Sequence, residues 1–342
     1  MRVLVTGHLG YIGSVLVPLL RQRGHAVVGL DTGFFKDCIL GVAPERTPEI
    51  VKDLRDLSAG DLEGFDGVCH LAGLSNDPLG SLDPALTSDI NHSASVRLAQ
   101  LARESGVPRF LFSSSCSIYG ASRAGELCDE TAPLKPLSAY AASKARAEED
   151  IAKLAAAEFS PAFLRNGTAF GFSPRLRMDL VLNDFVGAAL TCGTIRILSD
   201  GSPWRPLVHV ADIAQAFATI LETPREQWHN QALNIGCEEQ NYRVRDLAEI
   251  VQKVLPESRI EYAGTAGPDP RDYRVSFAKV RKLVPGFKPQ WNAERGARDL
   301  AQQLRALPSF AAELAQKRFV RLAELRRLIE SAALIPDLRW RR

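Results

Sequence analysis

The stretch RVLVTGHLGYIGSVLV, residues 2–17, carries the strongest local signal of fold in this chain. It runs from a short apolar segment through a turn with glycines at 7, 10 and 13 into an amphipathic helical pattern. In a strand–turn–helix unit, glycines at this spacing allow a tight turn, close approach of the backbone to a diphosphate and close packing of helix on strand. The helix that follows directs its first N–H groups at such an anion. The stretch therefore predicts a dinucleotide-binding unit.

A carboxylate closes the next predicted strand. Asp31 ends the segment VVGLD, 18 residues after Gly13. Such a carboxylate can accept hydrogen bonds from both hydroxyls of an adenosine ribose, and it would repel a 2′-phosphate. The sequence therefore predicts NAD rather than NADP as the cofactor. Asp53 follows a weak third strand, and it is expected either to reach the adenine or to cap a helix.

The first half of the chain alternates short β-branched runs with helical patterns. This alternation is typical of right-handed parallel crossovers with helices on both faces of one sheet. The predicted strands are 3–6, 26–30, 67–71, 109–113 and 162–165, and the predicted helices are 12–23, 84–105 and 138–157. The expected fold class is α/β: a doubly wound parallel sheet of the Rossmann type with a smaller C-terminal substrate-binding region.

We predict two regions, an NAD-binding Rossmann-type domain over 1–165 and a mostly substrate-binding α/β region over 166–342. A strand such as 232–236 is a candidate to return to the main sheet. The tail 310–333 is predicted to be helical, with a solvated arginine face opposite a Leu/Ile stripe. That face comprises Arg318, Arg321, Arg326 and Arg327. We also expect the loop residues Arg175 and Arg177 to face solvent, with a phosphate or a sugar carboxylate as their alternative contact.

Composition excludes several classes of function. The 342 residues include 42 Lys and Arg against 40 Asp and Glu, a net charge of +2 that gives no electrostatic case for nucleic acid or an anionic membrane. No apolar run is long enough to span a bilayer, and Met1 leads directly into a strand rather than a cleavable signal. The 6 cysteines form no CxxC pair and have no histidine at ligand spacing, so we expect neither a metal site nor a disulfide framework. The expectation is a cytoplasmic protein with no nucleic-acid or membrane partner.

Tyr140 and Lys144 stand four residues apart in the segment SAYAASK. On a helix this spacing places both side chains on one face. An ammonium beside a phenol favours the phenolate and is expected to lower the tyrosine pKa, so that Tyr140 could act as a general base. Residues 113–115 end the fifth strand at the cofactor edge of the sheet, where a serine hydroxyl could share a substrate proton with Tyr140.

Together these motifs resemble the extended short-chain dehydrogenase/reductase family, the NAD-dependent nucleotide-sugar epimerases and dehydratases. The resemblance covers nearly the whole chain up to about residue 290. It rests on TGHLGYIG (6–13), Asp31, DLRD (53–56), HLAG (70–73), Asn91, SSSCSIYG (113–120), YAASK (140–144), WRPLVHVADIAQAF (204–217) and the DPR that ends at Arg271.

The resemblance implies roles for individual residues. The implied catalytic residues are Ser115, Tyr140 and Lys144. The implied NAD-binding residues are Gly7, Gly10, Tyr11, Ile12, Gly13, Asp31, Asp53, Leu54, Leu71, Ala72, Gly73, Asn91, Ser113, Tyr140 and Lys144. The implied contacts to a nucleotide-diphosphate sugar are Ser75, Ser115, Thr168, Asn183, Arg205 and Arg271.

Two of these substrate contacts are arginines, whose planar forks suit a diphosphate because each can donate in pairs. Thr168 is a departure from the family pattern, since many members hold an asparagine there. Asn183 is expected to contact the sugar or diphosphate, with a helix-surface position as its alternative.

The reaction follows from what stands after Ser115. The family's 4,6-dehydratases place an Asp–Glu pair directly after the catalytic hydroxyl residue, and its decarboxylases usually place a Glu two positions after it. Here those positions hold Cys116, interpreted as a small filler, and Ser117, neither of which can act as a carboxylate. The resemblance therefore implies a 4-epimerase that works through a transient 4-keto sugar with Tyr140 as base.

Three further points complete the sequence-based expectations. A dehydratase or 4-reductase that uses a base in the segment SNDP (75–78) is the first alternative, and a non-catalytic NAD-binding scaffold is the second. Family members commonly pair the helix of Tyr140 with that of Asn91 across a dimer interface. Small residues on the first of these helices, Ala141, Ala142 and Ala145, allow such packing, so a homodimer is expected.

Overall fold

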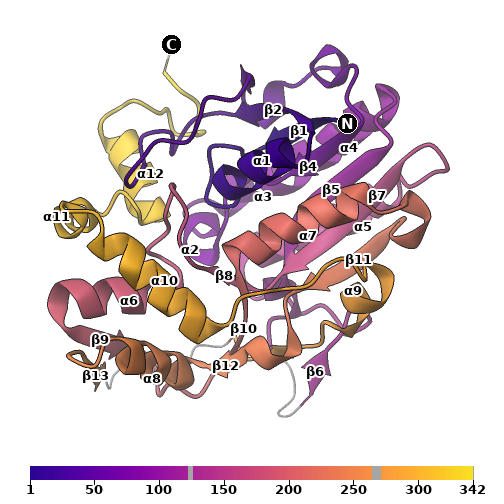
Figure 1. The fold of residues 1–342 in the computed structure, drawn as a ribbon. Coiled ribbons are helices and arrows are strands. Elements are labelled where there is room, and N and C mark those ends of the chain that lie inside the picture. Colours follow the sequence, from indigo (N-terminus) through magenta and orange to yellow (C-terminus); the bar gives the residue numbers. More distant parts are fainter. Residues whose placement is uncertain (122–125, 264–270, 342) are drawn as a thin grey trace.

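A seven-stranded parallel sheet lies at the centre of the molecule (Figure 1), in the order β3-β2-β1-β4-β5-β7-β11. The computed structural model describes residues 1–121, 126–263 and 271–341. The predicted doubly wound parallel sheet is confirmed, and the candidate strand 232–236 does return to it. The seven strands are β1 (Arg2–Thr6), β2 (Ala26–Asp31), β3 (Glu49–Val51), β4 (Gly67–His70), β5 (Arg109–Ser115), β7 (Ser160–Asn166) and β11 (Gln231–Ile235).

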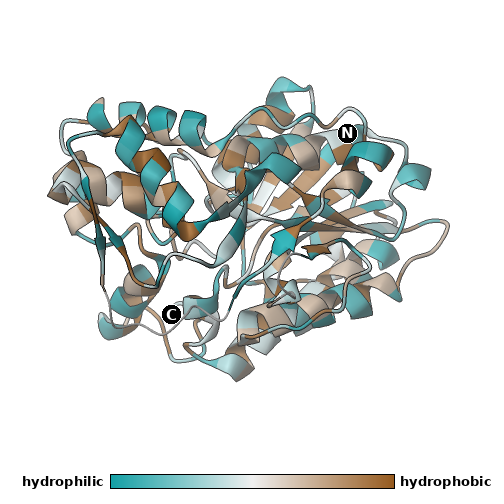
Figure 2. Ribbon diagram, turned by 90° about the horizontal axis from the view of Figure 1, so that it is seen from below, coloured by the Kyte–Doolittle hydropathy of each residue, from teal (hydrophilic) through white to brown (hydrophobic). Residues whose placement is uncertain are grey.

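Helices cover both faces of this sheet. The helices α1 (Gly13–Gln22) and α7 (Val210–Glu222) pack together on one face, and α4 (Ala94–Glu104) and α5 (Ala139–Ala152) pack on the other. Successive residues of β1 point to opposite faces, so Val3 joins the core under α1 and α7 whereas Leu4 joins the core under α4 and α5. Hydrophobic residues accordingly gather on the central strands and on the helix faces turned to them (Figure 2).

The predicted helix 84–105 consists of three pieces rather than one. A single π-helical turn, η3 (Asp89–Ser93), separates α3 (Pro84–Ser88) from α4. This turn carries Asn91, whose side chain is completely buried. A π-helical turn inserts an extra residue without changing the polar or apolar composition, so hydrophobic periodicity could not reveal it.

The C-terminal region adds small sheets and helices around a second core. Its strands form the sheet β12-β10-β8 and the pair β13-β9, and its strand β14 pairs with β6 (Leu127–Cys128) of the first region. The strands of the C-terminal region are β8 (Thr168–Phe170), β9 (Thr194–Ile197), β10 (Trp204–His209), β12 (Asn241–Arg243), β13 (Arg259–Tyr262) and β14 (Arg274–Val275). The accompanying helices are α6 (Val181–Cys192), α8 (Val244–Val254), α9 (Ala278–Leu283) and α10 (Ala293–Arg305). Short helical turns complete the chain: α2 (Asp77–Gly80), η1 (Leu54–Asp56), η2 (Ala59–Leu62), η4 (Cys116–Tyr119), η5 (Arg225–Gln227) and η6 (Glu238–Gln240).

The tail is helical, as predicted, but its arginine face is not solvated throughout. The tail forms two helices, α11 (Phe310–Ala315) and α12 (Arg321–Glu330), separated by a turn in which Lys317 has a φ of 56°. Arg321 is 2% exposed, although Arg326 and Arg327 do face solvent. Helical periodicity predicts which side chains share one face of a helix. It does not predict which other segments of the folded chain pack against the end of that helix, and this packing buries Arg321. Beyond α12 the chain runs back toward the loop that follows β2 (Figure 1).

The structure also bears on membrane spans, cysteines and metal sites. None of the helices in the described part of the chain is long and apolar enough to cross a membrane. All 6 cysteines are free thiols, and 4 of them are buried. Within residues 1–121, 126–263 and 271–341, no group of three or more His, Cys, Asp or Glu side chains could hold a metal ion. The boundary predicted at residue 165 stays a prediction, and the first two residues of the DPR motif lie outside the described residues.

Candidate active site

A cavity opens where β1, β2 and β4 end, at the carboxyl edge of the sheet. Ligands of open α/β sheets bind at this edge. Most of the cavity wall comes from the glycine turn, the residues after β2 and β3, and the residues after β4. They bring together eleven of the predicted NAD-binding residues: Gly7, Gly10, Tyr11, Ile12, Gly13, Asp31, Asp53, Leu54, Leu71, Ala72 and Gly73.

The glycine turn is packed too tightly for side chains. Gly7 has a φ of +72°, and a Cβ on it would lie 2.7 Å from the backbone nitrogen of Ala72. A Cβ on Gly13 would lie 2.3 Å from the carbonyl oxygen of Gly7. These approaches require glycine at both positions and keep the turn clear for a ligand's diphosphate. The turn therefore fits the dinucleotide that its sequence predicts.

Asp31 stands at the end of β2 with its carboxylate tied to the loop backbone. Its two oxygens accept hydrogen bonds from the N–H groups of Leu9 (3.0 Å) and Gly33 (2.8 Å). Burial raises the pKa of Asp31, and these two N–H donors oppose the shift. The carboxylate is thus held at the cavity wall in a fixed orientation, which suits recognition of a ribose diol.

Asp53 caps a helical turn. Its carboxylate accepts from the guanidinium of Arg55 (2.9 Å and 2.8 Å) and from the backbone N–H of the same residue (2.9 Å). Burial alone would raise the pKa of Asp53, but the bonds from Arg55 lower it below its usual range. Of the two roles expected for Asp53, the structure shows the cap, at a position that still lines the cavity.

Asn91 holds the backbone of Leu74, a residue of the cavity wall, in place. Its Oδ1 accepts from the N–H of Leu74 (2.7 Å), and its Nδ2 donates to the carbonyl of the same residue (2.9 Å). Asn91 is absent from the described residues that line the two cavities. The structure therefore does not support the predicted direct contact between Asn91 and NAD, because the amide is used to fix the loop after β4.

A second cavity of about 680 Å³ adjoins the first. Its size lies in the usual range for small-molecule sites. The two cavities share a wall made by Ile12, Leu71, Gly73, Ser75, Ala169 and Arg177. The second cavity brings together the predicted catalytic residues and most of the predicted substrate contacts: Ser75, Ser115, Tyr140, Lys144, Thr168, Arg205 and Arg271. The predicted NAD-binding residue Ser113 lines it as well.

The start of α5 sets the positions of Tyr140 and Lys144. Ser138 caps the helix by accepting from the N–H of Ala141 (3.1 Å), so the next residues enter the helix in a fixed rotation. One turn later, Nζ of Lys144 donates to the carbonyl of Ser113 (2.8 Å) and lies 4.5 Å from the centre of the Phe112 ring. Both contacts tie α5 to the end of β5, where Ser115 stands.

The pKa of Tyr140 departs from the sequence-based expectation. Burial raises this pKa to about 12, and a side-chain hydrogen bond with Ser115 opposes the shift. Burial lowers the pKa of Lys144 to about 8, while the nearby Glu148 opposes that change. The pKa of Tyr140 is therefore raised rather than lowered as predicted, because burial of the phenol disfavours its charged form.

The two predicted diphosphate-binding arginines meet at one end of the second cavity. Nη1 of Arg205 donates to the carbonyls of Trp204 (2.7 Å) and Arg271. Arg271 in turn forms an ion pair with Asp77, with Nη1 and Oδ2 2.6 Å apart. The other oxygen of Asp77 accepts from the hydroxyl of Ser138, the cap of α5. A carboxylate of the SNDP segment thus links Arg271 to the cap of α5, the helix that carries Tyr140.

Arg175 and Arg177 do not face solvent, which corrects the prediction. Arg177 is buried and pairs with Asp179 (2.9 Å), and it lines both cavities. Arg175 is also buried and donates to the carbonyls of Phe35 (2.7 Å) and Lys36. Their loop borders both cavities through Arg177. The polar composition of the loop could not show whether its arginines are buried or exposed to solvent.

Asn183 is likewise a supporting residue. Its Oδ1 accepts from the N–H of Gly171 (2.9 Å), and its Nδ2 donates to the carbonyl of Arg177 (2.9 Å). The side chain is completely buried and is not among the described residues that line the second cavity. The structure does not support its predicted substrate contact or its helix-surface alternative.

Two groups near Ser115 bear on the type of reaction. The Cys116 thiol is buried and donates to the carbonyl of Arg165 (3.2 Å), and burial raises its pKa, so it is no poised nucleophile. The hydroxyl of Ser115 donates to that of Ser117 (3.0 Å).

Sequence reasoning missed Asp184, a carboxylate that lines the second cavity and whose pKa is raised to about 6 by burial and by Asp179. No local motif marks it.

Comparison with known proteins agrees with this arrangement. The model of the NAD dependent epimerase/dehydratase family matches residues 3–236, so the chain belongs to this family and uses NAD as its cofactor. The chain is 30% identical to UDP-glucose 4-epimerase from Streptomyces lividans over 88% of its length and 93% of the relative.

Solved structures agree as well. The structure of MoeE5 in complex with UDP-glucuronic acid and NAD matches with a TM-score of 0.78 at 27% identity, covering 90% of this chain and 99% of that one. The Thermus thermophilus UDP-glucose 4-epimerase complex with NAD matches with a TM-score of 0.74 at 28% identity, covering 89% and 99%.

Proposed function

We propose that this protein is a 4-epimerase of a nucleotide-diphosphate sugar that works through a transient 4-keto intermediate. One observation carries the proposal. Ser115, Tyr140 and Lys144 converge in a cavity next to the NAD cavity, while the two positions after Ser115 hold Cys116 and Ser117 in place of carboxylates. Oxidation at carbon 4 needs the first three residues, and elimination of water or loss of carbon dioxide needs further acid–base groups.

Each residue then has a defined task. Tyr140 takes the proton of the 4-hydroxyl and returns it, and Ser115 holds that oxygen through its hydroxyl. Lys144, held by Ser113, keeps a positive charge near the cofactor edge of the sheet. NAD, when bound, supplies the acceptor for the hydride of carbon 4. If the keto sugar rotates in the cavity so that the hydride returns to the opposite face of carbon 4, the configuration at that carbon is inverted.

The substrate end is proposed to lie near Arg205 and Arg271, whose guanidinium groups suit a diphosphate. Because a relative at 30% identity is a UDP-glucose 4-epimerase, UDP-hexoses are the first substrates to test. Among the described residues that line this cavity, the arginines outnumber the three carboxylates, which favours an anionic ligand. The carboxylates are Asp77, Asp179 and Asp184.

A dehydratase or 4-reductase is the second candidate, and Asp77 is the observation that favours it. This carboxylate belongs to the SNDP segment and lies in the same cavity as Tyr140. Its ion pair with Arg271 and its bond from Ser138 occupy both oxygens, which counts against free acid–base use. A non-catalytic scaffold is disfavoured because the three catalytic residues are all present and lie together.

Product mass spectrometry tests the proposal. The purified protein, without added cofactor, is incubated with UDP-, dTDP-, GDP- and CDP-sugars, and the products are separated. We expect an isomer of unchanged mass, and we expect Tyr140→Phe to retain NAD while losing turnover. A product lighter by one water would instead establish a dehydratase. Undiminished turnover by Tyr140→Phe would overturn the assignment of the base.

We further propose that the protein is a cytoplasmic homodimer. All 6 thiols are free, as is usual in a reducing compartment. Ala142 and Ala145 on α5 are half-buried and small enough for close packing against a second copy. Light scattering coupled to gel filtration measures the mass in solution, and a monomer at micromolar concentration would contradict the dimer.

A further inference from the structure

A buried arginine from the C-terminal tail reaches the NAD cavity. Arg321, the first residue of α12, lines the same cavity as the glycine turn. It lies 85 residues beyond the end of the family match at residue 236. The tail therefore contributes to the cofactor site, although no motif in the sequence connects the two.

The contacts of Arg321 compensate only part of the charge on its guanidinium group. Its Nη2 donates to the carbonyl of Arg175 (2.7 Å), and its guanidinium carbon lies 4.6 Å from the centre of the Phe35 ring. Its Nη1 is buried without a hydrogen-bond partner in the described part of the chain. No carboxylate of those residues forms an ion pair with it, whereas its neighbour Arg177 is paired with Asp179.

Such an arrangement is costly in the absence of an anion. Removing a guanidinium from water costs several kcal/mol unless a counter-charge compensates for the loss. Burial lowers the pKa of Arg321 to about 10, so the group still carries its charge at neutral pH. Phe35 and a single carbonyl compensate only in part. A diphosphate held by the glycine turn would supply both the missing charge and the acceptor for Nη1.

We propose that Arg321 binds the diphosphate of NAD and that the tail beyond it closes the adenosine side of the cavity. The cofactor diphosphate would then lie between the N–H groups of the glycine turn and a guanidinium from the opposite end of the chain. Arg321 is assigned as a cofactor-binding residue, and its role does not depend on which reaction the enzyme performs.

The chain after α12 is fastened to the loop that follows β2. Nε1 of Trp340 donates to the carbonyl of Thr32 (2.5 Å), and the rings of Trp340 and Phe34 lie 6.1 Å apart. Thr32 and Phe34 both line the NAD cavity. The tail therefore holds one wall of the adenosine side in place.

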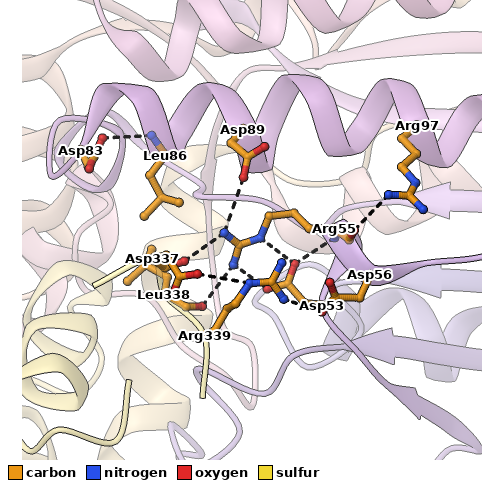
Figure 3. A network of polar contacts seen from close by, with 10 residues as sticks. All are labelled: Asp53, Arg55, Asp56, Asp83, Leu86, Asp89, Arg97, Asp337, Leu338 and Arg339. Atoms are coloured by element: carbon orange, nitrogen blue, oxygen red, sulfur yellow. Dashed lines mark hydrogen bonds and ion pairs between the residues drawn. The ribbon is translucent and has the colours of Figure 1, made fainter. Parts of the chain in front are cut away.

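A second set of contacts fastens the tail to the turn after β3 (Figure 3). Arg55 donates to the carbonyl of Asp337 (2.9 Å) while its other nitrogens hold the carboxylate of Asp53. Arg339 forms an ion pair with Asp56 on the same turn. Asp53 lines the cavity, so the network joins the tail to a cofactor-facing residue through one intermediate side chain.

The test compares Arg321→Met with Arg326→Ala, which removes an exposed arginine from the same helix. Binding of NAD, ADP-ribose and adenosine to the full chain, freed of cofactor, is measured by calorimetry. We expect Arg321→Met to weaken NAD and ADP-ribose by roughly 10- to 100-fold while adenosine binding stays within about 2-fold. Arg326→Ala is expected to bind all three ligands like the parent protein. The NAD-free Arg321→Met protein should also melt at a higher temperature than its parent, because an uncompensated buried charge has been removed.

Two results would overturn the proposal. One is unchanged NAD affinity in Arg321→Met, and the other is an equal loss for adenosine and NAD, which would indicate a structural role only. If the methionine variant fails to fold, Arg321→Lys keeps the charge but loses the planar fork, and it should show a smaller loss confined to the same two diphosphate ligands. None of these binding measurements depends on turnover, so a failed 4-epimerase assignment would leave them unaffected.

Discussion

Asp77 and Arg271 form an ion pair across the edge of the second cavity, with Nη1 and Oδ2 2.6 Å apart. The carboxylate also accepts from Ser138, which caps the helix of Tyr140. The arginine proposed to hold the substrate diphosphate is therefore already neutralised by a residue bound to the cap of α5. A diphosphate must compete with Asp77 for this guanidinium.

That competition leads to a prediction for Asp77→Asn. The amide keeps the shape but removes the competing charge, so we expect a nucleoside diphosphate to bind several-fold more tightly and epimerase turnover to persist. Arg271→Met should weaken the same ligand by roughly 10-fold or more. Calorimetry with UDP measures both variants and their combination. A loss of turnover without a change in affinity would assign Asp77 an acid–base role and favour the dehydratase alternative.

Lys144 predicts a pH-dependent stability. Burial lowers its pKa from 10.5 to about 8, so the unfolded chain binds more protons than the folded chain between these two values. The free energy of unfolding attributable to this group therefore rises with pH across that window. At pH 7, Lys144→Met should be more stable than the parent by roughly 1–2 kcal/mol, with the lost hydrogen bond to Ser113 offsetting part of the gain.

This stability difference should shrink as the pH rises from about 8 to 10.5. Urea unfolding of the NAD-free protein at several pH values measures it. Lys153→Met, an exposed change just after the same helix, is the matched control and should show no such trend. A Lys144→Met protein that is less stable than its parent at pH 7 would show that the contacts to Ser113 and Phe112 outweigh the burial of the charge.

A buried ion pair between α5 and β7 gives a third prediction. Glu148 of α5 and Arg165 of β7 lie 2.6 Å apart, and both side chains are only 7% exposed. Glu148→Ala leaves the guanidinium buried without its partner, and we expect a loss of about 3–5 kcal/mol in the free energy of unfolding. Glu149→Ala breaks an exposed pair with Lys153 on the same helix and should cost at most about 0.5 kcal/mol. Equal losses in the two variants, measured by denaturant unfolding, would refute this explanation.

Asp31 is expected to set the choice between the two nicotinamide cofactors. Asp31→Asn removes the negative charge at the ribose end of the cavity, so the preference for NAD over NADP should fall by roughly 10-fold or more. Fluorescence titration of the reduced cofactors measures the two affinities. Asp37→Asn, an exposed change in the following loop, should leave the ratio unchanged. An unaltered ratio in Asp31→Asn would show that another group excludes the 2′-phosphate.

Local signals predicted most of the fold and the cofactor turn. Strands buried on both faces appear as unbroken apolar runs, and Gly7 and Gly13 mark a turn that no side chain could enter. The pairing of Tyr140 with Lys144 follows from helical spacing, and Ser115 follows from the end of a parallel strand. Each of these features depends on residues close together in the sequence or on the rule that parallel strands end at one edge of a sheet. They can therefore be predicted from the sequence alone.

Tertiary structure decided the rest. Asn91 and Asn183 resemble binding residues in sequence, but packing turns their amides toward the backbone of Leu74, Gly171 and Arg177. Desolvation, which no motif records, raises the pKa of Tyr140 despite its neighbouring lysine. Arg321 enters the NAD cavity only because a turn divides the tail helix and its end meets the loop after β2. Sequence determines which groups are available, whereas burial and long-range contact decide which of them remain free to bind.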